Sequence, residues 1–212
     1  MPPMARIPPG RAGRMWLRRR LDTAERGREQ LDRKLRILIP EQQRLQTRAD
    51  RRREEWVAAH ADAQTWLLRA SLLGGQDAIR GAAPPDLVDL TVLWTSSMGV
   101  AYPEDVTLAS PGPDQPVRPD LLVLPGNAAV APAATAFRAA LLAGARAAAA
   151  AEAVRRLEAE IAVTRRRMRA LDKRWLPWLR DALATLELSL EQAEQEDGMR
   201  LRRTIQPHSG GS

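Results

Sequence analysis

Residues 17–73 read LRRRLDTAERGREQLDRKLRILIPEQQRLQTRADRRREEWVAAHADAQTWLLRASLL, and this stretch decides the fold. Positions spaced alternately four and three residues apart are apolar along its whole length, except at Arg28, Gln42 and Arg52. A straight α-helix has 3.6 residues per turn, so a stripe with a 3.5-residue repeat over about eight heptads requires a supercoiled partner helix. The stretch therefore predicts one long strand of a coiled coil.

The second strand is predicted near the C-terminus of the same chain. From Val154 to Trp178 the apolar positions again step by three and four residues. Between the two stretches, residues 75–135 hold nine of the sixteen prolines, which interrupt any helix. We predict a mainly α fold, with a long antiparallel two-helix coiled coil formed by the N- and C-terminal helices and a small, Pro-rich, partly β middle module. The residues that we expect along its seam are Leu17, Leu21, Leu31, Leu35, Leu38, Leu45, Leu157, Ile161, Met168, Leu171 and Trp175.

Helix breakers place the boundaries of these parts. The predicted parts are a flexible arm at 1–13, the first helix at 14–74, the middle module at 75–131, the second helix at 132–203 and a flexible tail at 204–212. Gly74 and Gly75 suit the end of the first helix, and Pro40 and Pro177 are expected to kink the two helices. If the two termini lie level, the numbers of any two residues that face each other across the seam should add up to roughly 210–217. This register would place Pro40 near Pro177.

Three runs in the middle module resemble β-strands. The first two are Leu87–Trp94 and Leu121–Leu124, and a third is possible around Val100 and Val106. Pro111–Asp114 is expected to form the turn-rich connection between the first two strands. The sequence thus predicts a short antiparallel hairpin or small sheet.

Composition excludes several kinds of chemistry. The chain has no cysteine, no apolar run of eighteen residues and no Walker A sequence, so we expect no disulfide, no membrane insertion and no direct nucleotide binding. Its two histidines, His60 and His208, lack neighbouring ligands at metal-binding spacing. No catalytic, cofactor-binding or metal site is predicted.

The net charge of +7 is unevenly distributed along the chain. Residues 1–53 carry 16 Lys and Arg against 6 Asp and Glu, whereas residues 74–135 carry 2 against 7. Arginine runs occur at 18–20, 51–53 and 165–167, with Arg169 close by. Three consecutive arginines spread over about 200° of a helix surface, so they do not form a single base-reading face. A solvated helix surface, a docking surface for acidic protein loops, and nucleic-acid binding remain open as interpretations.

Three phrases resemble the D subunit of the V-type and archaeal-type rotary ATPases. TRRRMRALDKRW at 164–175, followed by Leu176 and Pro177, is similar to the C-terminal helix signature of that family, with Asp172 where the family usually has Glu. RMWLRRRLDTAERGREQLDRKLRIL at 14–38 resembles its opening helix, and MGVAYP at 98–103 resembles its mid-chain phrase. The three phrases occur in the family's order.

The resemblance implies a non-catalytic central rotor shaft that couples ion translocation to ATP synthesis or hydrolysis. The implied partners are the hexameric head of A and B subunits, the small F subunit of the stalk and the C/d adaptor above the membrane rotor ring. The expected location is cytoplasmic, peripheral to the plasma membrane. Within this interpretation, the candidate head contacts are Arg18, Arg19, Arg20, Arg165, Arg166, Arg167 and Arg169. Candidate contacts for the companion F subunit are Met98, Gly99, Val100 and Pro103, which could equally form an ordinary turn after a strand.

Other interpretations lead to different expectations. A basic coiled-coil scaffold or nucleic-acid-binding protein would bind in a strongly salt-dependent way without an ATPase partner. The γ shaft of F-type enzymes is analogous, but it carries a larger α/β module between its helices. Trp175 and Trp178 are expected to fill a wide part of the coil beside Pro177 in preference to forming a bearing contact with a partner. An enzyme in its own right is the least favoured alternative.

Overall fold

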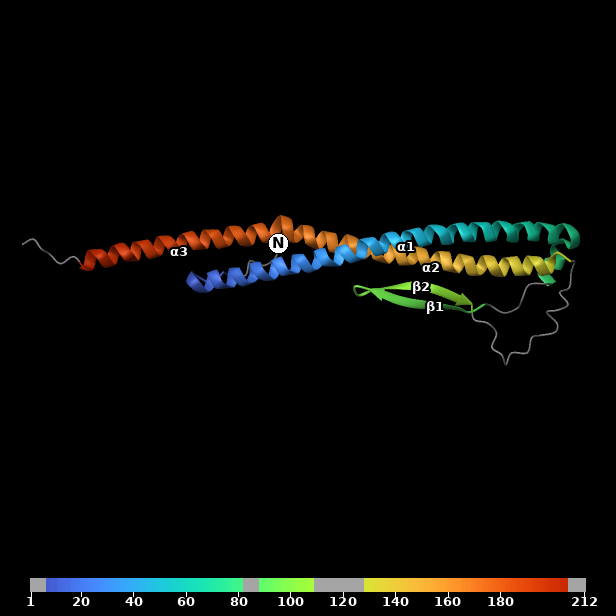
Figure 1. The fold of residues 1–212 in the computed structure, drawn as a ribbon, viewed down its shortest axis with the longest axis horizontal. Coiled ribbons are helices and arrows are strands. Elements are labelled where there is room, and N and C mark those ends of the chain that lie inside the picture. Colours follow the sequence, from blue (N-terminus) through green and yellow to red (C-terminus); the bar gives the residue numbers. More distant parts are fainter. Residues whose placement is uncertain (1–6, 82–87, 109–127, 206–212) are drawn as a thin grey trace, which may run out of the picture. The chain divides into compact units, whose positions relative to one another are not determined.

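Two long helical segments and one β-hairpin make up the fold (Figure 1). The structure, a computed structural model, describes residues 7–81, 88–108 and 128–205. The elements in chain order are α1 (Gly10–Gly81), β1 (Leu90–Ser97), β2 (Val100–Leu108), α2 (Val130–Ala170), a π-helix (Leu171–Trp175) and α3 (Leu176–Ile205). The predicted fold class, two long helices packed together with a small β element between them, is confirmed.

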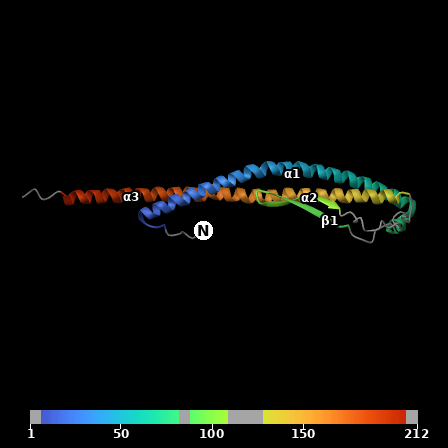
Figure 2. The ribbon, with the colours of Figure 1, turned by 60° about the horizontal axis from the view of Figure 1, so that its bottom comes forward.

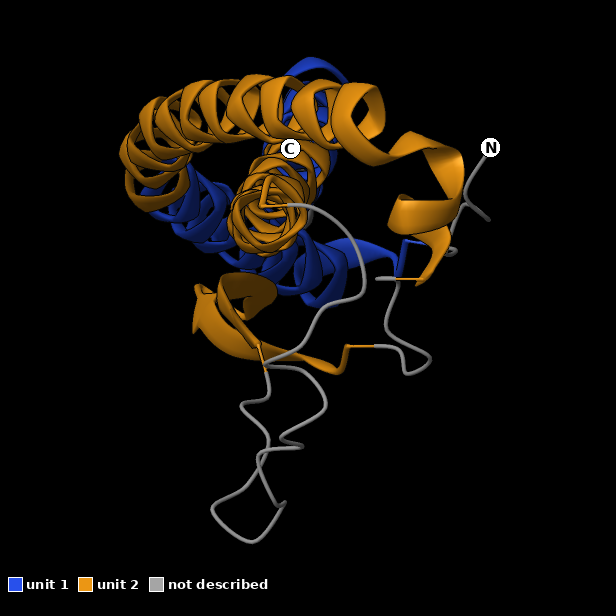
Figure 3. Cartoon of the chain, turned by 90° about the vertical axis from the view of Figure 1, so that its right-hand side faces the viewer, with its two compact units in different colours: residues 1–35, 163–212 blue, residues 36–162 orange. Residues whose placement is uncertain are grey.

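The chain divides into two compact units (Figure 3). Unit 1 comprises residues 1–35 and 163–212, and unit 2 comprises residues 36–162. Both long helical segments contribute residues to both units. Each unit is described separately below.

Glycines mark both ends of α1. The helix begins at Gly10, with φ of +72°, four residues before the predicted start. Gly13 does not prevent the helix, because its missing side chain gives room to the carbonyl oxygen of Pro8, which would lie 2.0 Å from a Cβ. The helix retains helical φ and ψ through Pro40, and its non-helical interior residue is Gly75, with φ of 68°. A short helical segment then continues to Gly81.

In unit 1, the N-terminal part of α1 packs antiparallel to α3 through large apolar side chains and ion pairs. Leu17, Leu176 and Leu179 are buried. Ion pairs join the two chain segments: Arg11 with Glu194 at 3.0 Å, Arg18 with Glu187 at 2.6 Å, Arg180 with Glu25 at 2.8 Å, and Arg28 with Asp172 at 2.8 Å. The two residue numbers of each ion pair add up to 200–205, so the predicted register of 210–217 is wrong. The prediction assumed level termini, whereas these contacts set the register.

After Pro177 the apolar stripe of the sequence shifts by one residue, to Leu179, Leu183, Leu186 and Leu190, and the π-helix explains this shift. The Leu176 N–H donates to the Leu171 carbonyl oxygen five residues earlier, and Pro177 has no N–H to continue the α-helical pattern. The wider turn adds one residue and moves the buried face from Trp178 to Leu176 and Leu179. Trp178 is 36% exposed and Leu176 only 4%, so the expectation that Trp178 fills the interior is wrong.

In unit 2, alanines form much of the contact between α1 and α2. Ala63 packs with Ala136 and Ala140, and a second cluster joins Ala70 to Ala129, Val130 and Ala133. Trp66 packs against both clusters. Small side chains allow two helices to approach closely, so the alanine-rich sequence of α2 produces a tight contact with α1.

Leucines and one glycine complete the helix contact in unit 2. Leu38, Leu45 and Leu157 are buried. Gly144 faces the indole of Trp56, whose Nε1 would lie 3.0 Å from an added Cβ. The Gln42 side-chain amide donates to Glu158 at 3.2 Å, which agrees with the register in unit 1.

The β-hairpin differs from the predicted one. β1 pairs antiparallel with β2, the run that the sequence suggests only as a possible third strand. The strands are joined by Met98 and Gly99, which have φ of 50° and 80°, as a two-residue type I′ turn requires. A bulge between Leu93 and Trp94 leaves Glu104 unpaired beside Pro103, a residue that lacks the N–H a regular ladder needs. The predicted strand Leu121–Leu124 and turn Pro111–Asp114 lie outside the described residues.

The hairpin runs beside α2 (Figure 2), and polar side chains attach it to α1 and α2 within unit 2. The Tyr102 hydroxyl donates to Glu41 on α1 at 2.8 Å. On α2, Arg156 donates to the Ala101 carbonyl at 3.3 Å and stacks 4.8 Å from the centre of the Trp94 ring. Arg146 lies 3.5 Å from Asp105. The hairpin is therefore fixed against the helix pair by contacts on two sides.

Candidate functional site

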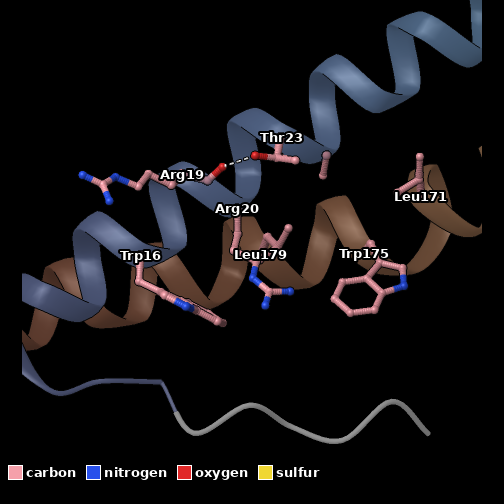
Figure 4. A pocket seen from close by; sticks show the side chains of 8 residues that line it. Trp16, Arg19, Arg20, Thr23, Leu171, Trp175 and Leu179 are labelled. Atoms are coloured by element: carbon pink, nitrogen blue, oxygen red, sulfur yellow. Dashed lines mark hydrogen bonds between the residues drawn. The ribbon is translucent and has the colours of Figure 1, made fainter.

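An aromatic and basic groove lies along the helix pair of unit 1 (Figure 4). It has a volume of about 480 Å³. The residues that line it are Trp16, Arg19, Arg20, Thr23 and Ala24 from α1, Leu171 and Trp175 from the π-helix, and Leu179 from α3. We name this hollow the Trp16–Trp175 groove.

The groove lies where the π-helix meets the part of α1 that carries Thr23 and Ala24. The extra residue of the π-helix displaces Trp175 from the buried seam, and the residue is half-buried. Opposite it, α1 presents Thr23 and Ala24, whose short side chains leave the space unfilled. Trp175 and Trp178 contact each other edge to face, with ring centroids 6.1 Å apart. Trp175 therefore borders an open hollow and Trp178 is exposed, in place of the filled coil that the sequence predicts.

Two arginines beside the groove are available to a partner. The Arg20 guanidinium lies 4.7 Å from the centre of the Trp16 ring, where a cation interacts favourably with the π face. Figure 4 shows its side chain entering the groove, whereas that of Arg19 extends away from it. Neither arginine has a carboxylate partner among the described residues. The groove therefore combines an apolar floor with uncompensated positive charge.

The other predicted head-contact arginines occupy a separate position in unit 1. Arg165, Arg166, Arg167 and Arg169 are exposed, and none of them has an ion pair within the described ranges. Because Arg28 pairs with Asp172, the rise of 1.5 Å per residue places this cluster about 24 Å along the helices from Arg18–Arg20. Arg18 itself pairs with Glu187 at 2.6 Å. The structure thus shows two basic surfaces in unit 1.

The three polar positions in the first seam have specific partners. Arg28 pairs with Asp172 across the helices, and the hydrogen bond that its guanidinium donates to this carboxylate raises the pKa of Arg28 above its usual value. Gln42 bonds to Glu158, also across the helices. Arg52 pairs instead with Glu55 on its own helix at 2.8 Å. Two of the three polar residues therefore connect the paired segments at defined heights.

The predicted seam residues differ in burial. Leu17, Leu35, Leu38, Leu45, Leu157 and Ile161 are buried. Leu21, Leu31, Met168, Leu171 and Trp175 are half-buried. The sequence pattern does not identify Leu176, which is buried one position beyond Trp175 because of the π-helix.

The candidate companion contacts lie at and beside the hairpin tip. Met98 is 43% exposed and Gly99 is exposed, while Val100 is half-buried and Pro103 is buried. A carboxylate and a tyrosine anchor the neighbouring strand to α1. The hydrogen bonds from Arg44 and then Tyr102 hold the pKa of Glu41 below its usual value. Burial, together with the bond to Glu41, raises the pKa of Tyr102.

The described residues offer surfaces for binding. Within them, no three His, Cys, Asp or Glu side chains converge in a way that could hold a metal ion. No helix in the described ranges is long and apolar enough to cross a membrane. The features that stand out are the Trp16–Trp175 groove, the Arg165–Arg169 cluster and the tip of the hairpin.

Comparison with known proteins agrees with the resemblance found in the sequence. Residues 15–206 match the family model for the D subunit of ATP synthase. The D subunit of the V-type ATP synthase of Thermotoga neapolitana is 28% identical over 199 residues, covering 93% of this chain and 96% of the relative. The D subunit of the A-type ATP synthase of Haloarcula marismortui is 29% identical over 204 residues, covering 93% and 86%. The chain therefore belongs to the family of ATP synthase D subunits.

Proposed function

We propose that this V/A-type D subunit is the central rotor shaft that couples ion translocation to ATP synthesis or hydrolysis, and that it is itself non-catalytic. The family match over almost the whole chain carries this proposal. The fold supports it, since two helical segments paired by leucines, alanines and cross-helix ion pairs provide a stiff element that can transmit torque.

The proposed partners are the hexameric head of A and B subunits, the F subunit of the stalk and the C/d adaptor above the membrane rotor ring. The complex would be peripheral to the cytoplasmic side of the plasma membrane. In this arrangement the exposed arginines of unit 1 face the head. The hairpin tip at Met98 and Gly99 is a candidate contact for the F subunit.

The shaft acts by contacting the catalytic interfaces unequally. A partner shifts a conformational equilibrium only when it binds the alternative states with different affinities. The exposed arginines of unit 1 differ in their surroundings, because Arg18 pairs with Glu187 whereas Arg165–Arg167 have no ion pair in the part of the chain that the structure describes. Each interface of a surrounding ring would then meet a different set of charges at each angle of the shaft.

Co-expression with the A and B subunits of an A-type synthase tests the proposed function. We expect one copy of the chain to assemble with each hexameric head and to change the rate of ATP hydrolysis by that head. Mass measurement of the intact complex gives the copy number. A chain that remains separate from assembled heads, or that binds nucleic acid at physiological salt in their presence, contradicts the proposal.

The role of the Arg165–Arg169 cluster is tested by replacing Arg165, Arg166 and Arg167 with alanine. Coupling should weaken, measured as fewer ions pumped per ATP hydrolysed, while the far-ultraviolet circular dichroism of the isolated chain stays helical. Replacing Arg51, Arg52 and Arg53 removes the same charge from α1 in unit 2 and serves as the control. Equal effects of the two triple variants would remove the cluster from the coupling mechanism.

A further inference from the structure

We propose that the Trp16–Trp175 groove receives a loop of the catalytic head that presents a carboxylate beside an apolar side chain. This inference rests on the proposed function and assigns to one site the kind of partner that it binds. Three independent features support it: the aromatic floor, Arg20 without a carboxylate partner among the described residues, and a glycine inside α1.

The floor of the groove suits an apolar side chain. Trp16 is half-buried, as are Trp175 and Leu171, so each presents part of its surface to the groove. Aromatic side chains in such positions contribute large contact areas with little loss of conformational freedom, and tryptophan is enriched among the residues that dominate binding energies. An apolar side chain inserted here would cover surface that the helix pair leaves exposed to water.

Arg20 specifies the charge of the partner. Its guanidinium is held over the Trp16 ring at 4.7 Å, and it has no carboxylate partner among the described residues. A planar guanidinium fixed in this way can bind a carboxylate with two parallel hydrogen bonds. By contrast, the nearby Arg26 pairs with Asp22 one turn away on the same helix. The groove is therefore complementary to an acidic segment.

Gly27 extends the same face of α1 beyond the groove. It follows Trp16 by eleven residues, which is about three helical turns and within about 20° of the same direction. Glycine is among the least favourable residues in a helix interior, where alanine is preferred. A Cβ added at Gly27 would meet nothing within 4 Å, so packing within the chain gives no reason for a glycine here. The absent side chain instead allows the backbone of a partner loop to pass close to α1.

The critical test compares Gly27→Ala with Gly198→Ala. A Cβ at either position enters open space, and both residues lie inside helices, so each substitution should raise the melting temperature of the isolated chain. Affinity for a reconstituted head of A and B subunits is then measured with each variant. We expect Gly27→Ala to weaken binding at least tenfold and Gly198→Ala to leave it unchanged. A substitution that stabilises the chain yet weakens the complex would reveal a close approach by the partner.

Arg20→Gln and Arg26→Gln provide the charge test. We expect Arg20→Gln to weaken binding to the head about tenfold and to reduce the dependence of that binding on sodium chloride. Arg26→Gln should do neither, because its charge is already compensated by Asp22.

The possible outcomes separate the groove from the function of the shaft. If the wild-type chain binds the head and both Gly27→Ala and Arg20→Gln bind equally well, the groove assignment is overturned while the shaft function stands. If the wild-type chain does not bind the head, the proposed function fails and the groove assignment fails with it. Self-association of the wild-type chain in sedimentation experiments that is lost in Gly27→Ala would assign the groove to a second copy and overturn the head-loop assignment.

Discussion

The two units join the same two chain segments by different means. Unit 1 uses large side chains such as Leu17 and Leu179, with arginine–carboxylate pairs across the helices. Unit 2 combines buried leucines with clusters of alanines around Ala63 and Ala70. Large residues that alternate with small ones leave a groove in unit 1, whereas the alanine contacts of unit 2 bring the helix backbones close together.

The two kinds of packing suit different roles: the close contacts of unit 2 favour stiffness, and the groove of unit 1 favours binding of a partner. Close packing of small residues resists enlargement and exposes few features for a partner. The π-helix in unit 1 departs from regular packing, and Trp175 at its end lines the same groove as Arg20 of α1. Local departures from ideal helix geometry are frequent at functional sites. We expect substitutions in the two units to have different consequences, and four predictions test this comparison.

The largest effect is expected from removing a buried leucine. Leu17 is completely buried in unit 1, and Leu17→Ala should lower the free energy of unfolding by about 2–5 kcal/mol. Leu188→Ala, at a side chain that is 60% exposed, should change it by less than about 0.5 kcal/mol. Urea unfolding followed by circular dichroism measures both. Equal small effects would mean that the ion pairs, not the leucines, join the helices of unit 1.

Enlarging a buried alanine tests the close packing of unit 2. Ala63 is completely buried against Ala136 and Ala140, so Ala63→Leu should destabilise the chain by about 1–3 kcal/mol through steric overlap. Ala61→Leu places the same side chain on the exposed surface of α1 and should be nearly neutral. Thermal unfolding of the two variants makes the comparison. Stabilisation by Ala63→Leu would show that the helices are loosely packed at this level.

The ion pairs of unit 1 should contribute less than either kind of packing. Arg180 and Glu25 are about half exposed and lie 2.8 Å apart, so a double-mutant cycle with Arg180→Ala and Glu25→Ala should give a coupling of about 0.2–1 kcal/mol. High salt should reduce that coupling. A coupling above about 2 kcal/mol that persists in 1 M salt would contradict the view that these pairs set the register more than the stability.

The smallest effect is expected from acid titration in unit 2. Hydrogen bonds from Arg155 and Arg156 lower the pKa of Glu152 to about 2 from its ordinary value of 4.5. The unfolded chain therefore takes up a proton at higher pH than the folded chain does. The resulting stability is fully present above about pH 4.5, and it is lost as the pH falls towards 2.

Melting temperatures at pH 7, 4 and 3 check this prediction. Relative to the wild type, Glu152→Gln should lose stability at pH 7 and a smaller amount at pH 3. Glu54→Gln removes an exposed carboxylate and is the control. A constant difference between wild type and Glu152→Gln at all three pH values would contradict the depressed pKa.

The sequence predicts the helix pair well because heptad spacing is a strong signal. It predicts the register poorly, because the apolar stripe of one helix fits its partner at several heights. Pairs such as Arg18 with Glu187 and Arg28 with Asp172 select one of them, and such pairs are not recognisable before the partner is placed. The pattern indicates β2 only as a possible third strand because Pro103 weakens its strand signal, and a bulge accommodates that proline.

The sequence predicts the groove only indirectly. The apolar stripe shifts by one residue after Pro177, and this shift is the signature of the extra residue in the π-helix. The side of the helix on which the resulting hollow opens depends on Thr23 and Ala24 on the opposite segment. Gly27 can be identified in the sequence, but only the structure shows that a Cβ at this position would meet nothing within 4 Å.

Rotation of the chain inside the head tests the shaft function most directly. Because the sequence has no cysteine, Asp77→Cys introduces a unique attachment point on a side chain that is 96% exposed. A bead attached there is observed while heads of A and B subunits, immobilised on glass, hydrolyse ATP. The shaft function predicts continuous rotation in one direction that stops when ATP is removed. A bead that stays stationary on heads that are hydrolysing ATP would contradict it.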